Sequence, residues 1–142
     1  MEISQVRRRV QAAISAARER SQRHRQAVAD AEGSYDRFLA EVAVPLARQV
    51  ANAFKAEGYD FTVSTPGRGL RIATDRGRDD YVDVTLDTDA VPPVVVGHIR
   101  YTRGSRTIDE EHPVKAGASP SQISEEEMLE FVMRALQPWI DR

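Results

Sequence analysis

Residues 81–87 read YVDVTLD, an alternation that places Val82, Val84 and Leu86 on one face of a strand and polar side chains on the other. Alternation of this kind is typical of an antiparallel sheet with one covered face. The neighbouring stretches share the same period of two and are separated by turns rich in glycine, proline and aspartate. The sequence therefore predicts four or five strands, over residues 61–64, 70–74, 81–87, 94–103 and 106–114.

These strands should pair in sequence order. The turns expected between them, at 65–69, 75–79 and 104–105, are too short to hold a crossover helix, and parallel neighbours need such a helix. The longer link between residues 87 and 94 is also too short to hold a crossover helix. An antiparallel meander is therefore expected.

The segment before the first strand has the composition of a helix. Residues 1–58 are rich in alanine, arginine, glutamine and glutamate. After position 34, large apolar side chains recur every three or four residues, so we expect a helix over 35–57 that covers the sheet. Gly33 could break the N-terminal helix or be only a weak point in a continuous helix. Pro45 should bend the helix or cause a one-turn irregularity, because proline has no backbone N–H to donate.

The end of the chain predicts another helix, over 124–141, after a linker at 116–122. Ser124 should cap this helix, with Glu127 completing a capping box, and Pro138 should end or kink it. Its apolar side chains form a broad face that should pack on the sheet: Met128, Leu129, Val132, Met133, Leu136, Trp139 and Ile140.

Together these elements predict an α+β fold. It consists of a long N-terminal helix that could be broken or kinked near Gly33 or Pro45, an antiparallel meander of four to five strands, and a C-terminal helix packed on the sheet. The 142 residues are enough for one domain with an appendage. We expect a helical arm at 1–34 and an α+β domain at 35–142.

The composition excludes several classes of protein. The chain has no cysteine, which excludes disulfides, thiolate metal sites and a cysteine nucleophile. It has no leader-like start and no apolar stretch long enough to span a bilayer, so a cytoplasmic protein without a membrane partner is expected. It also lacks a phosphate-loop or serine-nucleophile motif, and Gly67-Arg68-Gly69 is interpreted as a hairpin turn. We therefore expect a protein that is not an enzyme and has no cofactor.

One acidic group resembles a chemical site: Asp79, Asp80, Asp83, Asp87 and Asp89. Along an extended strand Asp83 and Asp87 would be about 13 Å apart, which is too far for one ion. Asp87 and Asp89 could supply some oxygen ligands of a Mg²⁺ or Ca²⁺ site, which would make the protein a small metal-dependent enzyme. The preferred interpretation is a solvated strand face whose turn aspartates bond to the local backbone.

Two of the three histidines fall in the sheet region. His98 and His112 could approach each other across the hairpin at 104–105 and, with the acidic residues 109–111, form an acid–base or metal-binding group. A histidine pair on the sheet surface without such a role is the preferred interpretation.

Charge is distributed unevenly along the chain. Residues 1–25 contain seven arginines and two glutamates, whereas residues 59–142 contain ten basic and fifteen acidic residues. Arginines in such excess could contact phosphates, so a nucleic-acid-associated protein is an alternative. The candidate phosphate contacts are Arg7, Arg8, Arg9, Arg18, Arg20, Arg23 and Arg25.

The same segment carries an apolar stripe that a small domain has no means to cover. Its residues recur at helical spacing, and His24 interrupts it as polar residues do in coiled coils. An amphipathic helix gains most of its stability by packing this face. We therefore expect an assembly or adaptor protein that binds a second copy of itself, most simply as a dimer, or another protein. The predicted interface consists of Ile3, Val6, Val10, Ala13, Ile14, Ala17 and His24.

Overall fold

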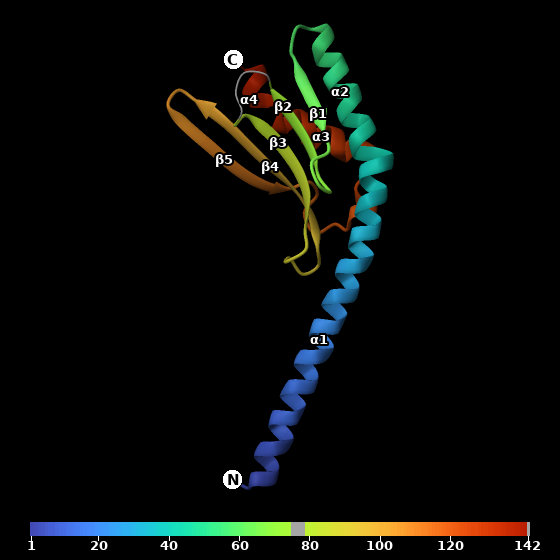
Figure 1. Ribbon diagram of the computed structural model, residues 1–142, viewed down its shortest axis with the longest axis vertical. Coiled ribbons are helices and arrows are strands. Elements are labelled where there is room, and N and C mark those ends of the chain that lie inside the picture. The colour runs from blue at the N-terminus through green and yellow to red at the C-terminus, as the bar shows by residue number, and fades with distance from the viewer. Residues whose placement is uncertain (75–78, 142) are drawn as a thin grey trace.

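The computed structural model describes residues 1–74 and 79–141, and within them the five predicted strands form one antiparallel meander in sequence order (Figure 1). Of the turn expected at 75–79, residues 75–78 lie outside the described residues. The strands are β1 (Phe61–Ser64), β2 (Leu70–Thr74), β3 (Tyr81–Asp87), β4 (Val94–Arg103) and β5 (Arg106–Pro113).

The alternation that predicts the strands also decides which side of the sheet is covered. In β4 every second residue over 95–101 is buried. Val84 of β3 lies opposite Gly97 of β4 on the covered face, whereas Asp83 lies opposite His98 on the other face. The sheet therefore has one apolar side and one polar side, as expected for a meander with half-polar strands.

The N-terminal helix is a single long rod built from α1 (Ile3–Phe38), a π-helical turn (Leu39–Ala43) and α2 (Val44–Ala56). The helix continues through Gly33, so the break considered there does not occur. The expected irregularity lies instead beside Pro45, as the π-helical turn.

The π-helical turn has a local cause. Pro45 has no N–H to donate to the preceding turn, and its ring crowds that turn. In the wider turn, the N–H of Val44 bonds to the carbonyl of Leu39, five residues earlier, which is the spacing of a π-helix. The rod ends at Ala56, and Gly58 just beyond it has a φ of 90°, the left-handed conformation that favours glycine.

The covered face of the sheet packs against the second half of the rod and the C-terminal helices. α3 (Glu125–Ala135) and α4 (Gln137–Ile140) meet at Leu136, just before Pro138, as the sequence predicts. Tyr35, Phe38 and Leu46 of the rod are buried in the same core as Met128 and Trp139. The fold is thus the predicted α+β arrangement.

The face that α3 turns toward the sheet is narrower than the sequence suggests. Leu129 and Met133, expected to pack on the sheet, are 38% and 39% exposed. Phe131 takes the central place, because Gly97 leaves room for its ring: a Cβ on Gly97 would lie 1.9 Å from Phe131 Cζ. Leu129 and Met133 lie beside α2 instead.

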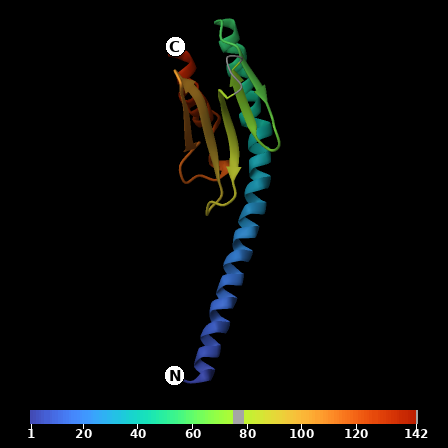
Figure 2. The ribbon, with the colours of Figure 1, turned by 60° about the vertical axis from the view of Figure 1, so that its left-hand side comes forward.

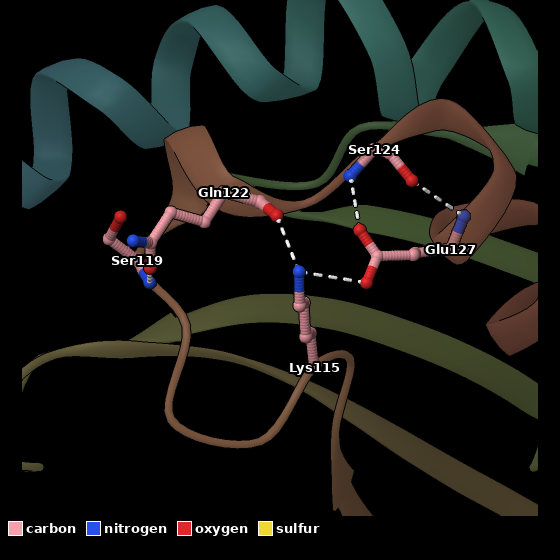
Figure 3. Close-up of polar contacts among 5 residues, drawn as sticks. All are labelled: Lys115, Ser119, Gln122, Ser124 and Glu127. Carbon is pink, nitrogen blue, oxygen red and sulfur yellow. Dashed lines mark hydrogen bonds and ion pairs between the residues drawn. The ribbon is translucent and has the colours of Figure 1, made fainter.

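The predicted linker 116–122 has secondary structure and buried side chains of its own. It contains a 3₁₀ turn (Pro120–Gln122), and Ala118 and Pro120 are buried. Lys115 Nζ lies 3.0 Å from the carbonyl oxygen of Gln122 and 2.8 Å from Glu127 Oε2 (Figure 3). The segment after β5 is therefore tied to the start of α3.

The capping box at the start of α3 is confirmed. Ser124 Oγ accepts the N–H of Glu127 at 3.1 Å, and Glu127 Oε1 accepts the N–H of Ser124 at 3.0 Å (Figure 3). The same carboxylate binds Lys115. These contacts hold the pKa of Glu127 down, to about 2, chiefly through Lys115 and then through Ser124.

The first half of α1 projects beyond the sheet as a free helix (Figures 1 and 2). Ala31 is the first buried residue of the chain, and Tyr35 and Phe38 follow on the same side. Among the described residues, no helix is both long enough and apolar enough to cross a membrane.

Candidate interaction surface

The exposed half of α1 presents large apolar side chains to solvent. Ile3 is 80% exposed, Val6 46%, Val10 51% and Ile14 45%. Spacings of three and four residues place them on one stripe of the helix. We call this free segment, residues 3–23, the arm. Six of the seven predicted interface residues lie on it, and all six are exposed: Ile3, Val6, Val10, Ala13, Ile14 and Ala17.

The arm is also strongly basic. Every one of its arginines is exposed, as is Arg25 just beyond it: Arg7, Arg8, Arg9, Arg18, Arg20 and Arg23. The spacing spreads them over the remaining helix surface, so no single face collects them all. The arm therefore combines one narrow apolar stripe with a broad cationic surface.

His24 differs from the other predicted interface residues because it contacts the domain. Its Nε2 lies 3.0 Å from the carbonyl oxygen of Thr88, in the loop after β3, and it is partly buried. Its Nδ1 is buried and makes no hydrogen bond. His24 therefore marks the point where the arm meets the domain.

Two further contacts fix the direction of the rod. Arg68 donates to Glu32 at 3.1 Å, and the hydroxyl of Tyr35 donates to the carbonyl oxygen of Val84 at 3.1 Å. Burial raises the pKa of Tyr35 far above its usual value, because the ionised phenolate would be poorly solvated there. The arm is thus a straight extension of a firmly attached helix.

A second apolar surface lies between α2 and α3. A groove of about 360 Å³ lies between them. Both helices lie at the other end of the rod from the arm (Figure 1). Leu129 and Met133, which do not pack on the sheet, form the α3 side of this groove. Its lining residues are Leu46, Gln49, Val50, Ala53, Phe54, Glu57, Leu129 and Met133.

The acidic residues between positions 79 and 89 do not come together at one site. Asp83 forms a two-pronged ion pair with Arg71, at 2.7 and 2.8 Å, on the exposed side of the sheet. Asp87 accepts the N–H of Asp89 at 3.0 Å, which is the local backbone bond expected of a turn aspartate. In the described part of the chain, no three histidine, aspartate or glutamate side chains lie together as a potential metal site.

Asp80 is the residue whose role the sequence interpretation missed. It is 4% exposed, and its carboxylate accepts the backbone N–H of Thr102 at 3.1 Å and the indole N–H of Trp139 at 3.0 Å. The signal was present in the sequence, because Asp80 shares its parity with Val82 and Val84, which face the core. It connects β4 and α4 across the edge of the core.

His98 and His112 do not form a pair. His98 lies opposite Glu111 and His112 lies opposite Gly97, so the two imidazoles are on opposite faces of the sheet. His98 Nε2 lies 2.6 Å from Asp109 Oδ1, and His112 Nε2 lies 3.4 Å from Glu110 Oε2, with all four side chains largely exposed. The surface-pair interpretation is therefore wrong in its pairing, because the one-residue offset of the register separates them.

His112 and Glu110 border a hollow of about 340 Å³ between β4, β5 and α3. Arg134 and the buried ring of Phe131 complete its wall. The side chains of His112 and Glu110 are both in contact with solvent. The pair therefore resembles an exposed ion pair more than a desolvated acid–base pair.

Comparison of the chain with protein-family models, curated proteins and solved structures finds no match. Its function must therefore be inferred from its own surfaces.

Proposed function

We propose that this protein is a non-enzymatic assembly or adaptor module that self-associates, or docks a partner protein, through the arm. The observation that supports the proposal is the line of large apolar side chains on a helix that the domain leaves uncovered, of which Ile3, Val6, Val10 and Ile14 are the members. Isolated exposed apolar residues are ordinary, but four in one stripe on a projecting element are typical of an interaction site.

Energetic considerations point the same way. Fully burying one valine or isoleucine side chain contributes about 1.5–3 kcal/mol. Most of the stability of a helix in a protein comes from the packing of its apolar face. Burial of the stripe would therefore stabilise both the association and the helix itself.

The test measures molar mass in solution by analytical ultracentrifugation over a range of concentrations. Val10→Glu places a charge in the stripe and should abolish association. Ser15→Glu adds the same charge at an exposed position on the opposite side of the helix and should leave association intact. A wild-type protein that is monomeric at every concentration and salt level, with no change on either substitution, would contradict self-association.

A nucleic-acid-associated function is the second candidate, and the seven exposed arginines over residues 7–25 favour it. Against it, the nearest aromatic side chains, Tyr35 and Phe38, are 2% and 4% exposed and so not accessible for base stacking. The two functions differ in their response to salt. Phosphate contacts weaken steeply as salt rises because counterions are released, whereas apolar pairing of two cationic arms should persist or strengthen as their repulsion is screened.

A further inference from the structure

The stripe of the arm continues into the face of α1 that packs on the domain. Val10, Ala17, His24, Ala31 and Phe38 follow one another at intervals of seven residues, and such positions stay on the same side of a helix with a drift of about 20° per interval. His24 already touches the domain, and Ala31 and Phe38 are buried in it. The side of the rod that offers the stripe is therefore also the side occupied by the domain.

This arrangement limits how a second copy can pair along the stripe. In a parallel pair, the same residues of both rods would face each other along their whole length. The two domains would then meet where Phe38 is already packed in the core of its own domain and Ala31 is already buried. An antiparallel partner meets no such obstacle if the N-terminal end of its helix stops short of His24 of the first copy. The free arm offers about 30 Å of helix for it.

The positions of the charges favour the antiparallel direction independently. In a parallel pair the three consecutive arginines at 7–9 would lie beside the same three of the partner, and like charges side by side oppose pairing. In the antiparallel pair they lie level with residues 14–16, which are uncharged. Arg20 then comes close to the partner's Glu2, an opposite charge.

We infer that two copies pair through antiparallel arms, with Val10 packed against the partner's Ala13 and Val6 against the partner's Ala17. In this register the central layers of the two stripes meet, and each valine faces a small alanine of the partner. The small side chains at 13 and 17, which lie on the stripe, let the helices approach closely. The partner's helix begins just before the level of His24, where the domain starts. This inference rests on the proposed self-association and adds its direction and register.

The absence of native cysteine makes disulfide trapping a direct test. Val6→Cys protein carrying a size tag is mixed with untagged Ala17→Cys protein and oxidised mildly with oxygen. Antiparallel pairing brings position 6 of one copy to position 17 of the other, so the mixed-size disulfide dimer should exceed either same-variant dimer at least fivefold. Ser15→Cys, on the outer side of the helix, serves as the control and should cross-link slowly.

Each remaining outcome overturns the inference in a recognisable way. Same-variant dimers in excess would mean parallel pairing. This result would agree with the proposed self-association but contradict the antiparallel direction. Dimers in solution that do not cross-link at either position and are abolished by Met133→Glu would mean that the copies associate through the α2–α3 groove. A monomer throughout would overturn the proposed self-association as well.

A second measurement does not depend on substitutions within the stripe. A spin label on Ser4→Cys, at an exposed position on the outer side of the helix, reports how far apart the two arms' N-terminal ends lie along the helix axis. Antiparallel pairing separates the labelled positions by about 20 Å along the helix axis, whereas parallel pairing places them level with each other. A distance that fits two labels level with each other, without that axial separation, would contradict the inference.

Discussion

At the scale of single residues, the buried carboxylate of Asp80 shows how one polar group can fix the meeting point of three elements. Two N–H donors, from Thr102 and Trp139, point at its oxygens. Burial of a carboxylate is costly unless it is hydrogen-bonded, so the donors and the acid stabilise one another. The position therefore requires an acceptor with two oxygens.

Asp80→Asn should destabilise the protein by about 1–3 kcal/mol, because the amide offers only one oxygen and turns an NH₂ toward a donor. Chemical denaturation monitored by Trp139 fluorescence measures the change. Asp79→Asn, the same substitution at the exposed neighbouring position, is the matched control and should shift stability by less than about 0.5 kcal/mol. Equal effects of both substitutions would remove the role assigned to Asp80.

Gly97 is required for its lack of a side chain. Gly97→Ala places a methyl group within the ring of Phe131 and should cost about 1–3 kcal/mol, as overpacking of a tight core does. Phe131→Leu in the same chain should recover part of that loss, since the smaller side chain leaves room for the methyl group. Denaturation of the two single variants and the double variant tests this coupling, and strictly additive effects would speak against it.

At the scale of elements, the start of α3 and the segment before it are joined by a charge-assisted contact. Glu127 has a pKa lowered to about 2 in the folded protein, against about 4.5 for the free group. A lowered pKa means that the ionised carboxylate favours folding above pH 4.5. This contribution is lost as the pH falls through 4.5 toward 2, where the group becomes protonated.

Glu127→Gln should therefore lower the melting temperature at pH 7, and its difference from the wild type should shrink as the pH falls below about 4.5. Glutamine preserves the capping acceptor toward Ser124, so the difference reports the ion pair with Lys115. Thermal unfolding followed by circular dichroism between pH 2 and pH 7 provides the measurement. A difference that does not depend on pH would show that the charge is not the cause.

The elements themselves were largely predictable. Period-two alternation and turn residues located four strands, with 106–114 as a candidate fifth that the structure confirms, and helical spacing located the rod and α3. Solvent on one side and core on the other impose those periods directly. The breaks at Pro45 and Pro138 were predicted for a similarly local reason. Leu129 and Met133 were misplaced because periodicity does not tell which part of a broad apolar face touches the sheet.

At the scale of the whole molecule, the arm contributes nothing to the buried core, since the chain has no buried residue before Ala31. Deletion of residues 1–20 should therefore leave the melting temperature of the dilute domain unchanged within about 2 °C. At high concentration, where arms pair, the intact protein should melt at the higher temperature because association stabilises the folded form. Differential scanning calorimetry at two concentrations measures both effects, and a deletion that destabilises the dilute protein would show that the arm supports the fold.

The sequence by itself determined the order, type and approximate ends of the elements, and it marked the arm as an amphipathic, basic helix. These are local properties, set by side-chain periodicity, capping and proline chemistry. Tertiary structure decided what depends on register and direction. It separated His98 from His112, joined Asp80 to Trp139 and Asp83 to Arg71, and set Phe131 over Gly97. A shift of one residue in strand pairing exchanges the two faces of a sheet, and no local pattern fixes how two such surfaces meet.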